Sequence, residues 1–206
     1  MKFYQWLTIS LMAMCLCTNA MAQDNADDTN EDKNIYDGDS FTIVPPANWL
    51  LVSGNLDPKD VAKLPENVKE HYTQRNTDVI FMDINSPDAE AKGFKDSLNI
   101  VTINEPIPLN DELVKELSTV LKQQYESMFE KFELENIEVT TLRDKKVLSV
   151  KGGYTVMSYK VKMEQTLIPA KNESLVLTCT YETEKDNADK IINACRESVA
   201  SLVLSE

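Results

Sequence analysis

The side chains that most often carry chemistry are few in this sequence of 206 residues. There is one histidine, His71, and it lies near the end of a predicted helix. A catalytic nucleophile needs a histidine or an activated lysine that a third polar group holds in place. No serine occurs in the G-x-S-x-G turn that marks one class of hydrolases. We therefore interpret His71 as a solvated surface residue and predict no catalytic residue.

Metal sites and phosphate-binding loops lack their usual ligand patterns. Zinc sites combine Cys and His ligands in spaced pairs, and this chain has a single histidine. A calcium loop in residues 23–34 would need a central glycine and a closing glutamate, and that segment has neither in place. The five glycines are scattered apart from Gly152-Gly153, so no glycine-rich phosphate loop is formed. The sequence predicts no metal ion and no cofactor.

Carboxylates are abundant, because 34 residues are aspartate or glutamate. Glu133, Glu135 and Glu138 follow the longest predicted helix, and Asp83 and Asp88 flank a predicted loop. General acid–base catalysis needs two environments that separate the pKa values of a carboxylate pair. Sequence spacing shows no such separation, so we interpret these side chains as solvated. A carboxylate-dependent hydrolase is the enzymatic alternative.

The N-terminus has the pattern of a bacterial export signal. Lys2 precedes an apolar run from Trp6 to Cys17, and Ala20-Met21-Ala22 supplies an A-x-A cleavage site. We expect residues 1–22 to be a signal peptide and the mature chain to be periplasmic or secreted. The apolar run is shorter than the roughly 20 residues that cross a bilayer. No later run approaches that length, so we predict no membrane span in the mature chain.

Lipidation of the leader is the alternative to simple cleavage. Cys15 and Cys17 lie near the end of the apolar run. A bacterial lipoprotein has small residues immediately before the modified cysteine, whereas Met14 and Leu16 occupy those positions here. The pattern therefore favours a cleaved signal peptide.

The net charge excludes one class of partner. Cleavage removes one lysine and no acid, so the formal charge changes from −13 to −14. Nucleic-acid binding depends on basic surface that displaces counterions, so we predict no nucleic-acid partner. Adsorption to an anionic membrane surface is disfavoured for the same reason. Strong acidity serves solubility, or it attracts a basic protein or cations.

Two cysteines, Cys179 and Cys195, remain after the leader is removed, and an even number in an exported chain suggests a disulfide. Alternation in residues 174–181 places Cys179 on the same strand face as Leu175 and Leu177. Helical spacing places Cys195 in the apolar stripe of the last helix. Both sulfurs are therefore expected in one strand–helix interface. The alternative is two buried free thiols.

The mature chain divides into a short tail and one domain. Residues 23–34 contain no large apolar side chain and cannot offset the entropy cost of ordering. We predict an acidic disordered linker over residues 23–34 and a single domain over residues 35–206.

Hydrophobic spacing predicts the elements of this domain. Helices are expected at Asp57–Tyr72, at Asp111–Phe132 with Asn110 as its cap, and from Asp186 or Asn187 to Leu202. Lys151-Gly152-Gly153 is predicted to be a tight hairpin with positive backbone angles. Strands in runs with few helices predict an α+β fold, in which helices pack on the faces of a twisted antiparallel sheet. The expected strands are 41–44, 49–52, 78–84, 98–103, 137–142, 147–150, 154–163 and 174–181.

Several short motifs resemble one known superfamily. Tyr36-x-Gly38-x-x-Phe41-x-Ile43-x-x-Pro46-x-x-Trp49 resembles the F-x-I-x-x-P-x-x-W opening of PsbP/DcrB-like proteins. The strand Ser97–Ile103 is similar to the N-I-x-V strand that follows in them. The resemblance covers residues 36–204 and implies an α/β/α sandwich. It also implies that Phe41, Ile43 and Trp49 pack in the core and that Asn99 satisfies backbone groups at a strand edge.

Proteins of this superfamily are mostly non-catalytic and include a photosystem subunit, envelope lipoproteins, chaperones of secreted effectors and a Ran-binding factor. Fold transfers more readily than function, and none of their binding residues matches a position here. We therefore expect a non-enzymatic binding or accessory protein whose partner is another envelope protein or a small ligand. Loops Asn85–Phe94 and Ile107–Asn110 are the expected contacts. A periplasmic immunity protein that neutralises a basic toxin is the alternative.

Overall fold

The computed structural model describes residues 35–53, 77–83, 94–156 and 158–205. The predicted signal peptide, the linker, the helix Asp57–Tyr72 with His71, and most of the loop Asn85–Phe94 lie outside the described residues.

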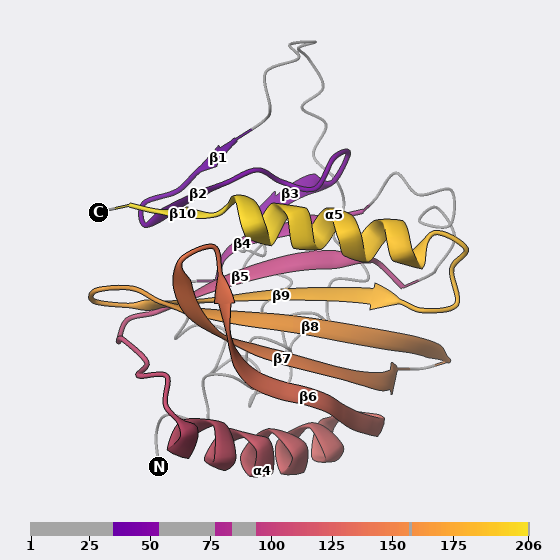
Figure 1. Cartoon of the computed structure of the whole chain (residues 1–206). Helices are drawn as coiled ribbons and strands as arrows, with labels where there is room; N and C mark the ends of the chain where they lie inside the picture. The colour runs from indigo at the N-terminus through magenta and orange to yellow at the C-terminus, as the bar shows by residue number, and fades with distance from the viewer. Residues whose placement is uncertain (1–34, 54–76, 84–93, 157, 206) are drawn as a thin grey trace, which may run out of the picture.

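Two antiparallel sheets form the framework (Figure 1). The larger sheet has the strand order β3-β4-β5-β9-β8-β7-β6, and the smaller one has the order β1-β2-β10. Strands β1 (Tyr36–Asp37), β2 (Phe41–Ile43) and β10 (Val203–Leu204) bring the start and the end of the domain together. The strands of the larger sheet are β3 (Leu50–Ser53), β4 (Thr77–Met82), β5 (Ser97–Ile103), β6 (Glu130–Leu142), β7 (Lys145–Val156), β8 (Tyr159–Pro169) and β9 (Ser174–Glu182).

Each face of the larger sheet has its own hydrophobic core. Helix α4 (Asp111–Met128) packs in the core that contains Val176, and α5 (Ala188–Ser201) packs in the core that contains Leu175 and Leu177. Because alternate residues of β9 enter different cores, the sheet lies between the two helices. This arrangement confirms the predicted α+β class with helices on the faces of an antiparallel sheet.

Helix α4 begins as predicted and ends earlier. The side chain of Asn110 accepts a hydrogen bond from the backbone N–H of Leu113 at 2.8 Å, which caps the helix. The helix ends at Met128, so Phe132, predicted as its last residue, lies in β6 instead. The rings of Tyr125 and Phe132 nevertheless pack edge to face, with centroids 4.7 Å apart. The helix was predicted too long because Phe132 continues the helical spacing of apolar residues, although it enters the same core from a strand.

The predicted glycine hairpin is wrong. Gly152 and Gly153 lie inside β7, where they pair with both β6 and β8, and neither has a positive φ. The chain instead reverses after Leu142, where Arg143 has a φ of 56°, and again between Val156 and Tyr159. The predicted strand 154–163 therefore belongs to two strands.

Packing explains why glycine occupies position 152. A Cβ at Gly152 would lie 3.0 Å from the carbonyl oxygen of Glu133 and 3.2 Å from the ring of Phe132. At Gly153 the nearest atom, the carbonyl oxygen of Val161, would be 3.4 Å away, which is ordinary contact. Gly152 thus provides the space into which Phe132 packs.

The residues of the family-like motifs are mostly in the core. Phe41 and Ile43 are buried, and Trp49 packs partly buried against the same cluster. Asn99 corrects one expectation, because β5 lies between β4 and β9 and is not an edge strand. Its side chain is fully buried in the middle of the sheet.

The two glycines give a matched test of this packing. We expect Gly152→Ala to lower the free energy of unfolding by about 1–3 kcal/mol, because the new methyl group overpacks Phe132. Gly153→Ala should be neutral or stabilising by up to about 1 kcal/mol, because alanine restricts the unfolded chain more than glycine does. Urea denaturation of both variants measures the difference. Equal effects of the two substitutions would contradict the assignment.

Candidate binding site

An open hollow lies at one end of the larger sheet, where β5 ends and where the β6–β7 and β8–β9 connections turn. Its volume is about 640 Å³. Three separate segments meet there, and they supply Pro106, Ile107, Pro108, Leu109, Lys145, Lys146 and Pro169.

A buried serine fixes the wall of the hollow. Ser174, the first residue of β9, accepts a hydrogen bond from the N–H of Ile107 at 2.8 Å. Its hydroxyl also donates to the carbonyl oxygen of Glu105 at 3.0 Å. The prolines at 106 and 108 restrict φ on both sides of this anchor. The wall is therefore held in one conformation before any partner binds.

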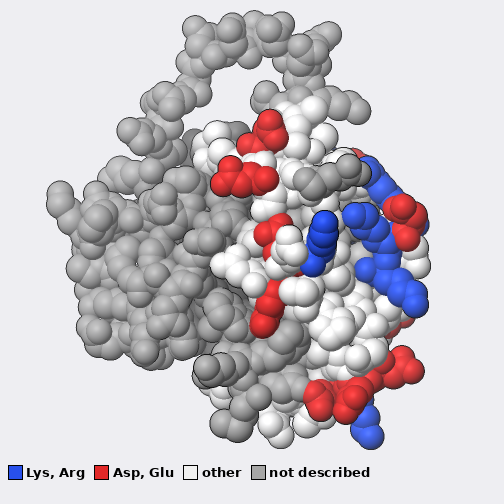
Figure 2. Space-filling view, turned by 90° about the vertical axis from the view of Figure 1, so that its left-hand side faces the viewer, with Lys and Arg blue, Asp and Glu red and all other residues white. Residues whose placement is uncertain are grey.

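The hollow has a cationic side. Arg143, Lys145 and Lys146 are exposed around the turn that precedes β7, with Asp144 as the one acid among them. None of these three cations forms an ion pair with another residue in the described ranges. Figure 2 shows Lys and Arg side chains gathered beside uncharged surface at this end of the molecule. The overall charge of −13 makes this positive turn distinctive.

Four residues of the lining offer no free backbone N–H donor. Pro106, Pro108 and Pro169 have no N–H group, and the N–H of Ile107 already donates to Ser174. These four residues therefore offer a bound group apolar surface and no backbone donor. Donors come from the ammonium groups of Lys145 and Lys146, which also line the hollow.

Sequence reasoning located part of this site. The predicted contact loop Ile107–Asn110 supplies Ile107 and Leu109, whereas Pro169 and the two lysines were not predicted. One sequence signal was present, because the segment 143–146 has the densest group of cations in the chain.

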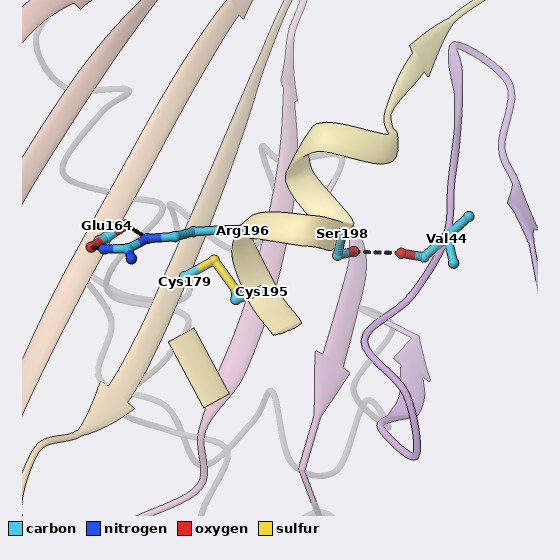
Figure 3. Close-up of a disulfide and its surroundings, with 6 residues drawn as sticks. All are labelled: Val44, Glu164, Cys179, Cys195, Arg196 and Ser198. Carbon is cyan, nitrogen blue, oxygen red and sulfur yellow. Dashed lines mark hydrogen bonds and ion pairs between the residues drawn. A yellow bond between two sulfur atoms is a disulfide. The ribbon is translucent and has the colours of Figure 1, made fainter. Parts of the chain in front are cut away.

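The predicted disulfide joins Cys179 of β9 to Cys195 of α5, with 6.2 Å between the Cα atoms (Figure 3). The alternative of two free thiols is therefore wrong for this structure. Two further contacts hold α5 in place. Arg196 forms an ion pair with Glu164 of β8, and the hydroxyl of Ser198 donates to the carbonyl oxygen of Val44 at 2.6 Å.

A buried ion pair lies where the chain enters β5. Asp96 is fully buried and accepts a hydrogen bond from Lys185 at 2.8 Å and one from the N–H of Glu182 at 2.9 Å. Lys185 also donates to the carbonyl oxygen of Phe94 at 3.1 Å. Burial raises the pKa of Asp96 above its ordinary value of 3.8, although both of its hydrogen bonds oppose that shift. No local sequence pattern indicates this pair, whose members are 89 residues apart.

Two of the carboxylates named from the sequence contact neighbouring polar side chains. Glu135 forms an ion pair with Lys162 at 3.0 Å, and Glu138 accepts a hydrogen bond from the side chain of Asn136. Asp88 lies outside the described residues. Within the described ranges, no three His, Cys, Asp or Glu side chains are grouped so that they could hold a metal ion. No helix among those residues is long and apolar enough to cross a membrane.

The structure is similar to that of cyanobacterial PsbP (CyanoP) from Synechocystis sp. PCC 6803. The two match with a TM-score of 0.55 over 84% of this chain and 92% of CyanoP, at 13% sequence identity. The chain has a PsbP-like fold. This confirms the architecture that the short sequence motifs implied.

Two further structures match this PsbP-like fold less closely. LpqN, involved in cell envelope biogenesis of Mycobacterium tuberculosis, matches with 12% identity and a TM-score of 0.45, over 81% of this chain and 83% of LpqN. The Ran-binding protein Mog1p of Saccharomyces cerevisiae matches with 13% identity and a TM-score of 0.45, over 80% and 89%. No protein-family model and no curated protein sequence matches the chain.

The disulfide should contribute to the stability of the PsbP-like domain. We expect Cys179→Ala/Cys195→Ala to lower the free energy of unfolding by about 3 kcal/mol, the chain-entropy value for a loop of about 15 residues. Denaturation with and without reductant measures this. Reductant should destabilise the natural chain by a similar amount and leave the variant unchanged. A natural chain that is insensitive to reductant after complete reduction would contradict the prediction.

The buried pair gives a prediction with a defined pH dependence. We expect Lys185→Met to lower the free energy of unfolding by about 3–5 kcal/mol at pH 7, because it leaves the Asp96 carboxylate buried without its cation. Folded Asp96 holds its proton more tightly than unfolded Asp96, so its contribution to stability falls as pH rises from 3.8 through its raised pKa. Because the contact with Lys185 lowers the pKa of Asp96, its removal raises that pKa further, so the carboxyl takes up a proton more readily near pH 4 and the penalty should be smaller there than at pH 7.

A double variant separates charge from packing. Asp96→Asn/Lys185→Met keeps an acceptor for the N–H of Glu182 and removes the unpaired charge, so it should be more stable than Lys185→Met alone at pH 7. Urea denaturation at both pH values measures the difference. An equal penalty at both pH values, with no recovery in the double variant, would show that charge is not the cause.

Proposed function

We propose that this chain is an exported, non-enzymatic accessory protein of the bacterial envelope that binds another protein through the hollow beside Pro108. The observation that supports this most directly is the anchored apolar wall of the hollow. Ser174 uses its hydroxyl both as acceptor and as donor to hold residues 105–107. A wall that is ordered in advance lowers the entropy cost of binding.

The shape of the hollow favours a protein over a small ligand. Small-molecule sites enclose most of the surface of their ligand. This hollow is open to solvent, and Pro106 and Pro108 on its wall are exposed. An exposed apolar surface with a polar rim is typical of the centre of a protein interface.

Two observations support an exported accessory protein. The leader pattern in residues 1–22 and the disulfide Cys179–Cys195 both suit an oxidising compartment. The most perturbed buried carboxylate, Asp96, has a structural role, because it is hydrogen-bonded to Lys185 and to the backbone at Glu182. Structural ion pairs also shift pKa values, so the raised pKa of Asp96 does not require a catalytic role.

Site-specific photocrosslinking in the source cells tests the proposal. A benzophenone amino acid at Pro108 should give a discrete crosslinked product with a second envelope protein, because this side chain is exposed at the hollow. The same group at Lys190 is the matched control, because that residue is exposed on α5 near the opposite end of the sheet. Immunoblotting and mass spectrometry identify the products. No product from position 108, or the same product from both positions, would refute this site.

A further inference from the structure

We infer that the hollow binds a short peptide segment in which apolar residues adjoin aspartate or glutamate. The inference rests on the proposed function and specifies the chemistry of the partner. Its basis is an apolar wall, in which three prolines and Ile107 offer no free backbone N–H, beside two lysines that form no ion pair with another described residue.

The wall determines how the apolar part of the segment is held. Pro106, Pro108, Leu109 and Pro169 supply side-chain surface, and the three prolines supply no N–H group. A partner strand therefore cannot form the regular ladder of backbone hydrogen bonds that strand addition requires. Recognition must come from side chains packed against the wall, which selects apolar residues.

The lysines of the hollow determine the charge that a bound segment should carry. Lys145 and Lys146 line the hollow, and Arg143 stands next to them in sequence, while Asp144 and Glu105 are the acids adjacent in sequence to these residues. Among the described residues that line the hollow, Lys145 and Lys146 are charged and none is acidic. Two ammonium groups that form no ion pair within the described part of the chain favour a carboxylate on the bound segment.

The lining favours carboxylate over phosphate. Phosphate sites at helix N-termini and in glycine-rich loops use several backbone N–H groups. The wall has no free backbone donor at Pro106, Ile107, Pro108 or Pro169. An acidic peptide therefore fits better than the phosphate headgroup of an anionic lipid.

Salt dependence should separate the local attraction from the charge of the whole chain. A net charge of −13 repels an acidic peptide over long distances when salt is low. At about 0.15 M salt the screening length is about 8 Å, so the lysines beside the peptide dominate. We therefore expect the affinity to fall as salt rises from about 0.15 M to about 1 M.

The experiment uses random dodecapeptides displayed on phage, selected on the full exported chain. Peptides that bind the hollow are those that Pro108→Trp blocks, since the indole ring would occupy part of the hollow. We expect these peptides to contain Asp or Glu close to Leu, Ile, Val or Phe. Lys145→Glu/Lys146→Glu should weaken them about tenfold, while Lys190→Glu, the matched control, changes their affinity less than twofold. Circular dichroism confirms that each variant is folded.

A charge exchange completes the test. Peptides with their acidic residues replaced by lysine should bind Lys145→Glu/Lys146→Glu more tightly than they bind the natural chain. Recovery that Lys190→Glu does not reproduce indicates local pairing between the peptide and Lys145 and Lys146, because a general increase in negative charge would act in both variants.

The outcomes distinguish this inference from the proposed function. Hollow-binding peptides without acids, or ones insensitive to the lysine variants, would overturn the inference, while a crosslink from position 108 would leave the proposed function intact. Lysine-dependent binding to phosphatidylglycerol vesicles with no enriched peptide would overturn the acidic-peptide assignment in favour of a lipid. Absence of both the crosslink and any peptide blocked by Pro108→Trp would overturn both.

Discussion

Burial of strand β9 on both of its faces is the constraint on which the rest of the structure depends. Each residue from Ser174 to Tyr181 is buried, so this strand must contribute to two cores at once. Three of its residues also make polar or covalent contacts with other parts of the chain. Ser174 anchors the wall of the hollow, Cys179 bonds to α5, and the N–H of Glu182 binds Asp96. A displacement of β9 would therefore move the hollow, the last helix and the buried ion pair together.

Features with a local cause could be predicted from the sequence. Alternation over residues 174–181 identified the strand and the face of Cys179, because the side-chain period of a strand is two. Asn110 was identified as a cap because its side chain needs only the backbone three residues later. The errors at Phe132 and Gly152 have one common cause. The ring of Phe132 continues the helical spacing of α4 from a strand, and Gly152 leaves the space for that ring. No local sequence pattern indicates that the ring of Phe132 packs against Gly152.

The candidate site was only partly predictable because it exists only in the folded chain. Its lining comes from three segments centred near residues 107, 145 and 169. Sequence reasoning reached the first segment, since binding residues tend to lie on loops over a rigid scaffold. The lysines of the second segment could be related to the site only from the fold, which places them beside that loop. The pair Asp96–Lys185 could not be predicted for the same reason. In a sequence with this many charged residues, no local pattern identifies the two that become buried together.

The position of the hollow explains how a common scaffold can carry different functions. At 13% identity to CyanoP, the chain keeps the architecture because alternating apolar residues, of many types, satisfy the two cores. Most of the lining is outside those cores. Pro106, Pro108, Lys145 and Lys146 are exposed, whereas Ile107 is buried and joins the α4 core. Substitutions at the exposed positions can change the surface of the hollow without disturbing β9 or either helix. Ile107 and Ser174 cannot vary in that way, because they connect the wall to the fold. The likeness to CyanoP therefore identifies the scaffold, and the residues on the rim must identify the partner.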